Sequence, residues 1–120
     1  MGVSPGYREF VLEQFSRVAP VTARSMFGGV GLYSGGVFFG LIDDDTLFLK
    51  VDDSSRSDFE AHGMRPFTPY GDRASMRQYY ELPAAALEDP EALGVWLKKA
   101  LAAARRKQGK RRSPRPRGSR

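Results

Sequence analysis

The sequence contains no cysteine and only one histidine, which limits the covalent links, metal sites and catalytic groups that the chain can form. Without cysteine the chain forms no disulfide, holds no thiolate zinc site and carries no cysteine nucleophile. His62 alone cannot build a multi-histidine metal site within one chain. No G-x-S-x-G frame supplies a nucleophile that His62 could activate, and its position near the end of an expected helix suits an interaction with the helix dipole. We therefore expect no catalytic residue, no metal site and no cofactor.

Long apolar runs and a secretion signal are also missing. The longest apolar stretch near the middle of the chain covers residues 37–42 and is interrupted by Gly40, whereas a helix that crosses a bilayer needs about 20 apolar residues. The N-terminal residues lack the basic segment followed by an apolar segment that marks a signal peptide. We expect a cytoplasmic protein with no membrane segment.

Acidic residues are absent from residues 105–120, and this makes the charge distribution uneven. Residues 1–104 hold ten basic and fourteen acidic residues, so the sequence pI of about 9.8 reflects the tail and not the body. We expect a folded domain over 1–104 and a disordered basic tail over 105–120, with disorder beyond about Lys107, because like charges repel and nothing apolar is left to bury. The tail could bind nucleic acid nonspecifically through its basic residues. These are Arg105, Arg106, Lys107, Lys110, Arg111, Arg112, Arg115, Arg117 and Arg120.

The first half of the chain predicts one helix and three strands. Ser4 and Pro5 are typical of a helix start, because the serine oxygen can accept an unpaired N–H and proline already has a helical φ. Apolar residues then recur at helical spacing until Pro20. From Met26 onward, three segments rich in aromatic and branched residues predict strands joined by short turns, which indicates an antiparallel meander. These segments are residues 26–33, 37–42 and 47–51.

The second half predicts a short helix, two strands and a final helix. Residues 53–55 provide a helix cap and Gly63 a stop, while prolines limit the strand over 66–70 and the strand over 75–82 is better defined. Asp89 and Pro90 open the last helix, which buries Trp96. The element order α-β-β-β-α-β-β-α indicates an α+β fold of two layers, with a five-stranded antiparallel sheet and helices on one face.

Glycine-rich and acidic segments invite functional interpretations that their spacing does not support. The cluster over residues 27–36 lacks both the G-x-G-x-x-G arrangement between a strand and a helix and the Gly-Lys-Ser/Thr of a P-loop, so we interpret it as a bulge and a hairpin. The acids at 43–45 and 52–53 lack the pattern of a calcium loop and are better interpreted as solvated turns.

Neighbouring aromatic residues on the expected strands divide between the two faces of the sheet. Phe38 and Phe39 are adjacent, as are Tyr79 and Tyr80, and adjacent strand residues point to opposite faces. One ring of each pair should therefore lie in the core and the other outside. The outer rings and Phe48 could stack on nucleic acid bases, but contact with a partner protein fits the acidic body better.

Five segments, in order along the chain, carry a resemblance to a known family. They are RSMFGGVGLY (24–33), LFLKVD (47–52), GMRPF (63–67), YYELP (79–83) and WLKKA (96–100), with Phe59 between the second and the third. Together they resemble the N-terminal domain of the TfoX/Sxy family, over about residues 5–105. The resemblance implies a fold like that of type III secretion chaperones. It also implies a regulator of DNA-uptake competence genes, although the second, helical domain of full-length members has no counterpart here.

The resemblance brings no catalytic residues, so we expect a non-enzymatic regulatory or adaptor protein that contacts a partner such as the transcription machinery. A nucleic-acid accessory protein that acts through its tail is the alternative, and an enzyme with an anion pocket at Arg24, Tyr33 and Lys50 is a third. A homodimer is compatible with each. The expected partner- or ligand-binding residues are Arg24, Phe27, Gly28, Gly29, Tyr33 and Lys50. For Arg24, an ion pair with Glu81 or Asp52 competes with a guanidinium that stays available to a partner.

Overall fold

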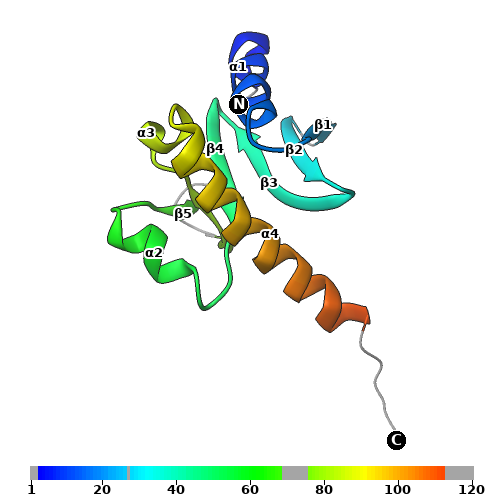
Figure 1. The fold of residues 1–120 in the computed structure, drawn as a ribbon, viewed down its shortest axis with the longest axis vertical. Coiled ribbons are helices and arrows are strands. Elements are labelled where there is room, and N and C mark those ends of the chain that lie inside the picture. Colours follow the sequence, from blue (N-terminus) through cyan, green and yellow to red (C-terminus); the bar gives the residue numbers. More distant parts are fainter. Residues whose placement is uncertain (1–2, 27, 69–75, 113–120) are drawn as a thin grey trace, which may run out of the picture.

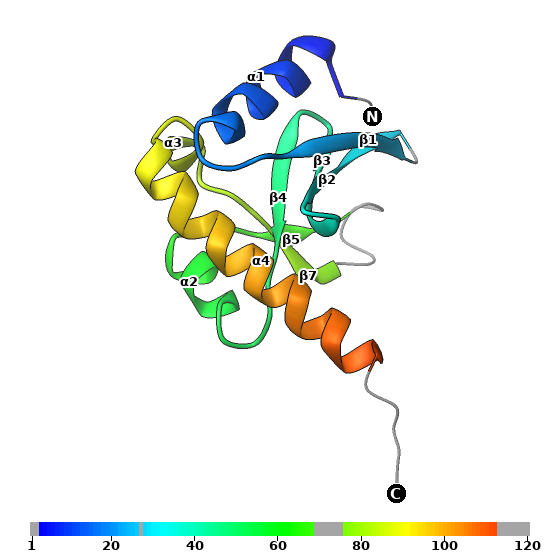
Figure 2. The ribbon, with the colours of Figure 1, turned by 45° about the vertical axis from the view of Figure 1, so that its right-hand side comes forward.

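The computed structural model describes residues 3–26, 28–68 and 76–112. These residues form an antiparallel sheet with helices on one of its faces (Figures 1 and 2). The helices are α1 (Pro5–Ser16), α2 (Arg56–Ala61), α3 (Ala84–Leu87) and α4 (Pro90–Arg112). The strands are β1 (Thr22–Met26), β2 (Gly29–Ser34), β3 (Val37–Asp43), β4 (Thr46–Lys50), β5 (Pro66–Phe67) and β7 (Met76–Glu81). In space the strands follow the order β1-β2-β3-β4-β7-β5. The predicted α+β fold is confirmed.

Within the described residues the sheet has six strands where the sequence predicted five, because the first strand was missed. Residues 26–33 were expected to form one strand, but Met26 ends β1 and Gly29 begins β2, and the two strands pair in antiparallel fashion. Gly28 lies in the turn between them with φ of +82°, a conformation that only glycine adopts at no cost. β1 lacks the alternation of apolar and polar residues that marks a strand, since it lies at the edge of the sheet with most of its residues exposed.

The predicted meander of β2, β3 and β4 is confirmed, and its turns show why the strands stop where they do. Gly35 and Gly36 have φ of +58° and +79°, while Asp44 and Asp45 both have φ of +52°. Two consecutive residues with positive φ give the tight turn that matches the twist of a hairpin, and glycine and aspartate tolerate it best. The acids at 43–45 therefore shape a turn, as expected.

The predicted helix starts at Ser4 and Asp89 are confirmed. The helix expected after residues 53–55 begins at Arg56, but the side chain of its N-cap residue makes no capping hydrogen bond, and a further short helix was missed. The Ser4 hydroxyl accepts a hydrogen bond from the Tyr7 N–H of α1, and the Asp89 carboxylate accepts from the N–H groups of Glu91 and Ala92 in α4. The missed helix is α3, a single turn that follows Pro83. One turn is too short to produce a periodic apolar pattern in the sequence.

The core lies between the sheet and α4, which crosses one face (Figures 1 and 2). Phe15 of α1 meets Phe39 of β3 with ring centroids 5.4 Å apart, and Phe59 of α2 meets Trp96 at 4.5 Å. Tyr80 of β7 completes the α2 contact. All these rings pack on one face of the sheet, so the predicted arrangement of helices on a single face is confirmed.

α4 extends farther than the sequence predicted. Disorder was expected beyond about Lys107, but the helix continues to Arg112. The residues between these points are mostly lysine, arginine and glutamine, which are good helix formers and lengthen a helix that is already nucleated. The expected disorder is therefore wrong for residues 108–112, and residues 113–120 lie outside the described part of the chain.

Candidate functional site

A row of three aromatic residues with a cationic residue at each end crosses the face of the sheet opposite the helices. Pairing in the sheet places Arg24 opposite Gly31, Tyr33 opposite Phe38, and Lys50 opposite Tyr79. Residues that are paired across strands point to the same face. We call the five side chains of this row the ladder; they are Arg24, Tyr33, Phe38, Tyr79 and Lys50.

Consecutive members of the ladder are in contact. The Arg24 guanidinium carbon lies 5.7 Å from the centroid of the Tyr33 ring. The ring centroids of Tyr33 and Phe38 are 5.3 Å apart, and those of Phe38 and Tyr79 are 6.0 Å apart. Lys50 Nζ lies 4.7 Å from the Tyr79 centroid and donates a hydrogen bond to the Tyr79 hydroxyl at 3.1 Å. The row thus joins two cations through three tilted rings.

The two ends of the ladder differ in their exposure to solvent. Arg24 is exposed, whereas Lys50 and Tyr79 are each only 8% exposed. A buried ammonium group needs a polar partner, and the Tyr79 hydroxyl supplies one. Tyr33 and Phe38 are partly buried between these ends. A partner can therefore reach the Arg24 end of the ladder, while the Lys50 end belongs to the structure of the sheet.

Gly31 lets the ladder close over β2. A Cβ atom at Gly31 would lie 2.9 Å from Met26 Sδ, 3.1 Å from a ring carbon of Phe38 and 3.4 Å from one of Tyr33. The first two distances are shorter than ordinary van der Waals contact and the third is at its lower limit, so the three side chains occupy the space that a larger residue would need. The glycine-rich segment thus serves close packing of side chains, which agrees with the structural interpretation drawn from the sequence.

The structure brings together three of the six expected binding residues. Arg24, Tyr33 and Lys50 share the open face, although Arg24 and Lys50 lie at opposite ends of the ladder and do not line a common anion pocket. Gly28 is in the β1–β2 turn and Gly29 begins β2. Phe27 lies outside the described residues.

Phe38 and Tyr79 connect these predicted residues but were not among them. The sequence placed one ring of each neighbouring pair outside the core, and this is confirmed: Phe39 and Tyr80 are buried on the helix side, with Phe38 and Tyr79 on the other. The register between strands that are distant in sequence was the missing information, because β4 pairs with β7 across 28 intervening residues or more.

Neither ion pair expected for Arg24 is formed. Its guanidinium lies over Tyr33 and not beside Glu81 or Asp52. The Asp52 carboxylate instead accepts a hydrogen bond from the Arg106 guanidinium at 2.6 Å. Arg24 is on the edge strand β1, three strands away from β4 and the segment that follows it, so those acids are out of reach.

Asp52 ties the basic end of α4 to the body of the protein. Burial raises the pKa of Asp52, but hydrogen bonds from the Ser54 side chain and the Ser55 backbone, together with the Arg106 guanidinium, outweigh burial and hold the pKa below its usual value. Of the predicted nucleic-acid-binding residues, six lie in α4, namely Arg105, Arg106, Lys107, Lys110, Arg111 and Arg112. Arg115, Arg117 and Arg120 lie outside the described residues.

Metal and histidine chemistry find no geometric support in the described part of the chain. Among residues 3–26, 28–68 and 76–112, no cluster of three or more histidine and acidic side chains could hold a metal ion. The His62 ring packs edge-on against Trp96 with centroids 5.2 Å apart, and its Nδ1 lies 2.9 Å from the carbonyl oxygen of Asp58. These contacts account for His62 as a residue that closes α2 over α4.

Comparison with known proteins gives one family match. Residues 13–104 match the model of the TfoX N-terminal domain, which covers most of the chain and every described strand. No curated protein matches the sequence. No helix in the described ranges is long and apolar enough to cross a membrane.

Proposed function

Because the chain belongs to the TfoX N-terminal domain family, we propose that it is a non-enzymatic adaptor in transcriptional regulation of the competence type. The observation that carries the proposal is the exposed end of the ladder, on the face of the sheet opposite the described helices. There the Arg24 guanidinium lies over Tyr33, whose ring in turn contacts Phe38. Arginine and aromatic residues contribute most of the binding energy at many protein interfaces. A protein partner that presents a carboxylate next to an apolar side chain fits this surface.

Replacement of Arg24 separates a binding role from a structural one. The cation–π contact with Tyr33 contributes only about 0.5–1 kcal/mol at an exposed site, so Arg24→Ala should leave the melting temperature almost unchanged. Arg24→Lys keeps the charge but loses the planar fork that pairs with a carboxylate through two hydrogen bonds. Both variants should therefore lose function while they keep the fold.

The experiment is a complementation test in the organism that carries this chain. Deletion of the gene should lower transcripts of the DNA-uptake genes, and the wild-type gene should restore them. Arg24→Ala and Arg24→Lys should fail to restore them, whereas Arg17→Ala, an exposed arginine at the end of α1, should restore them fully. If deletion of the gene leaves transcripts of the DNA-uptake genes unchanged, the proposal is wrong.

The alternative function, nonspecific binding of nucleic acid, is favoured by a different observation. α4 continues with helical geometry through Arg112, so six basic residues lie on a helix that extends from the body (Figure 1). A basic segment binds phosphates through the release of counterions, without regard to base sequence. The two functions are compatible, because the ladder and the end of α4 are separate surfaces.

A further inference from the structure

We propose that the edge strand β1 and helix α1 together form a docking groove for an extended peptide that carries a carboxylate. The inference goes beyond the proposed function, because Arg24 points to one face of β1 and the groove opens on the other. It keeps one premise of that function, namely that the partner is a protein. Three observations support it: an edge of β1 that no described strand pairs with, the hollow beside it, and an arginine in that hollow whose buried Nε has no partner among the described residues.

The edge of β1 offers backbone groups to an added strand. β1 is the first strand of the sheet, and among the described strands its one partner is β2. The tight turn at Gly28 makes Met26 and Gly29 the hydrogen-bonded pair that closes the hairpin. Along an antiparallel ladder, residue pairs that exchange backbone hydrogen bonds alternate with pairs that do not. Ala23 and Ser25 therefore point their N–H and C=O groups away from β2. Edge strands of this kind accept peptides as an additional strand.

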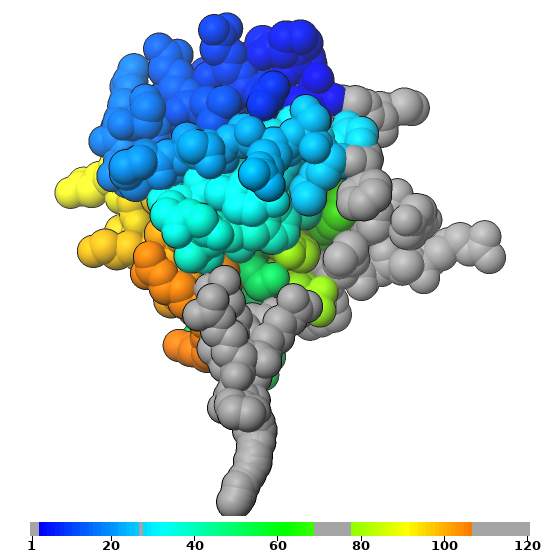
Figure 3. All heavy atoms as spheres, turned by 90° about the vertical axis from the view of Figure 1, so that its right-hand side faces the viewer, coloured from blue at the N-terminus to red at the C-terminus, as the bar shows by residue number. Residues whose placement is uncertain are grey.

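Two adjoining hollows run between this edge and α1. The first, of about 560 Å³, reaches from Val3 and Pro5 to Ser25 and Val30. The second, of about 820 Å³, continues toward Val21 and Ala23. Arg8, Glu9 and Leu12 line both hollows, so they form one groove along α1. Figure 3 shows this side of the molecule, with the β1–β2 hairpin below α1.

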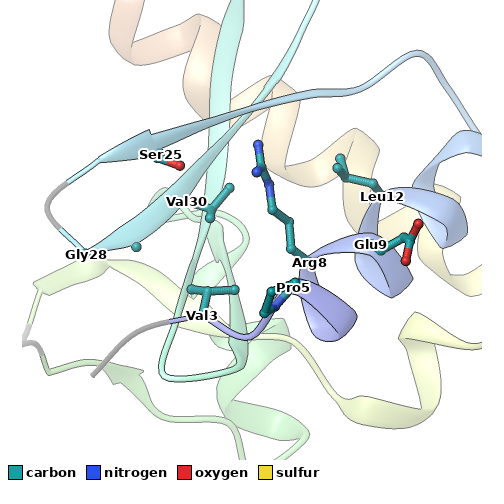
Figure 4. Close-up of a pocket in the computed structure, with 9 residues that line it drawn as sticks. Val3, Pro5, Arg8, Glu9, Leu12, Ser25, Gly28 and Val30 are labelled. Atoms are coloured by element: carbon teal, nitrogen blue, oxygen red, sulfur yellow. The ribbon is translucent and has the colours of Figure 1, made fainter.

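Arg8 is the basic residue of a groove whose lining also includes the acidic residues Glu9 and, in the second hollow, Glu13. Its Nε atom is buried and has no hydrogen-bond partner, and no hydrogen bond or ion pair to the Arg8 side chain is found within residues 3–26, 28–68 and 76–112. In Figure 4 the side chain rises from α1 toward Val30 and β1, while the Glu9 carboxylate points away from it. A buried donor without a partner costs free energy. A carboxylate that enters the groove would supply the missing acceptor and pair with the charge.

These features together define the occupant. In an added strand, alternate side chains point to the α1 side of the sheet and enter the groove. Apolar side chains would meet Leu12 and Val30, and a carboxylate between them would meet Arg8. A second copy of this chain fits less well, because β1 (Thr22–Met26) contains no acidic residue to offer to Arg8.

The test uses a blocked synthetic peptide, Thr-Val-Thr-Glu-Thr-Val-Thr, and the full chain. Titration followed by backbone amide NMR should shift signals of β1 and α1 and protect the amides of Ala23 and Ser25 from hydrogen exchange. A peptide with glutamine in place of glutamate should bind about tenfold more weakly, as expected for the loss of one charge-assisted hydrogen bond. Arg8→Gln should weaken binding of the glutamate peptide by the same factor and leave binding of the glutamine peptide unchanged.

Matched variants complete the design. Arg17→Gln, at the C-cap of the same helix and outside the groove, should bind as the wild type does. Ala23→Pro removes an outward N–H and should abolish binding, and if it fails to fold, Arg8→Glu tested with a lysine peptide provides an independent charge reversal. Equal affinity for the glutamate and glutamine peptides, or no binding at about 1 mM peptide, overturns the proposal. The proposal is also overturned if the chain is a dimer that Ala23→Pro converts to a monomer, because the occupant of the β1 edge would then be a second copy of the chain.

Failure here and failure of the proposed function give different results. Arg24→Ala leaves the groove intact and should bind the peptide normally. If the peptide binds but gene deletion leaves the DNA-uptake transcripts unchanged, the groove stands and the proposed function falls. If Arg24→Ala abolishes complementation but the peptide does not bind, the reverse holds.

Discussion

At the scale of single residues, Trp96 offers the clearest test of the core. It is 8% exposed and packs against Phe59 and His62 of α2 and its cap, as the apolar face of the last helix predicted. Trp96→Ala should lower the free energy of unfolding by about 3–5 kcal/mol, because it removes buried surface and leaves a cavity. Urea denaturation measures this loss. Val95→Ala, at a neighbour that is 52% exposed, should change little.

Gly31 tests whether the ladder depends on close packing. Gly31→Ala adds a methyl group where Met26 Sδ, Phe38 and Tyr33 already crowd the position, so it should destabilise the protein by about 1–2 kcal/mol through overpacking. Aromatic ring signals of Tyr33 and Phe38 should shift in the NMR spectrum. Gly6→Ala is the control: nothing lies within 4 Å of its added Cβ in α1, so it should stabilise the protein by about 0.5–1 kcal/mol. Equal effects at both positions would contradict the packing argument.

Residue-level patterns predicted which side chains face outward but not which of them meet. Alternation along each strand placed Phe38 and Tyr79 outside the core, and this required only the period of a strand. That Tyr79 lies beside Lys50 and Phe38 follows from the pairing of β4 with β7, which no local pattern encodes. The same gap explains why Asp52 was one of the two acids considered as a partner of Arg24, whereas its guanidinium partner in the structure is Arg106, 54 residues away.

At the scale of elements, the sequence predicted those with strong periodic patterns and missed those without. The helix starts at Ser4 and Asp89 and the meander turns at 34–36 and 43–46 are local chemistry, which a sequence shows directly. β1 is exposed along most of its length, so burial imposes no pattern on it. The last residues of α4 were missed for a different reason. They continue an existing helix and have high helix propensity, whereas the sequence analysis expected repulsion between their charges to keep them disordered.

The ion pair between Arg106 of α4 and Asp52, in the segment after β4, should make the protein less stable as the pH falls. The pKa of Asp52 in the folded protein is lower than the ordinary 3.8, so its ionised form favours folding at pH above that value. This contribution is lost as the pH falls through the lowered pKa. Asp52→Asn should therefore reduce stability at neutral pH and flatten the decline below about pH 4.

Thermal unfolding between neutral and acidic pH measures this effect. Asp53→Asn is the control, because the Asp53 side chain is fully exposed and its ion pair with Arg56, at 2.8 Å, is screened by solvent and should contribute little to stability. Arg106→Gln should reproduce part of the loss at neutral pH, since the guanidinium is one of the groups that lower the Asp52 pKa. If the melting temperatures of wild type and Asp52→Asn fall in the same way as the pH is lowered below about 4, the Asp52 contacts do not stabilise the fold.

At the scale of the whole molecule, three surfaces divide the possible contacts. The ladder lies on the sheet face opposite the described helices, and the groove lies between α1 and the edge of the same sheet. The basic end of α4 extends away from α1 and β1 (Figure 2). The body is acidic, with fourteen acidic and ten basic residues in 1–104, so nucleic acid should approach from the α4 end. Protein contacts and nucleic-acid contacts would then not compete for the same residues.

Salt dependence of DNA binding tests this division of the molecule. A basic segment that contacts about five phosphates of duplex DNA should give a slope of log K against log salt of roughly −4 to −5, because each contact contributes about −0.9. A chain that ends at Arg112 keeps six of the nine basic residues in 105–120 and should bind with a shallower slope. A chain that ends at Ala104 should lose DNA binding and keep its fold, apart from the stability that Arg106 adds through Asp52. Fluorescence anisotropy with duplexes of unrelated sequence measures all three slopes. If the chain ending at Ala104 binds DNA as strongly as the full chain, the body carries the nucleic-acid site and the basic segment does not.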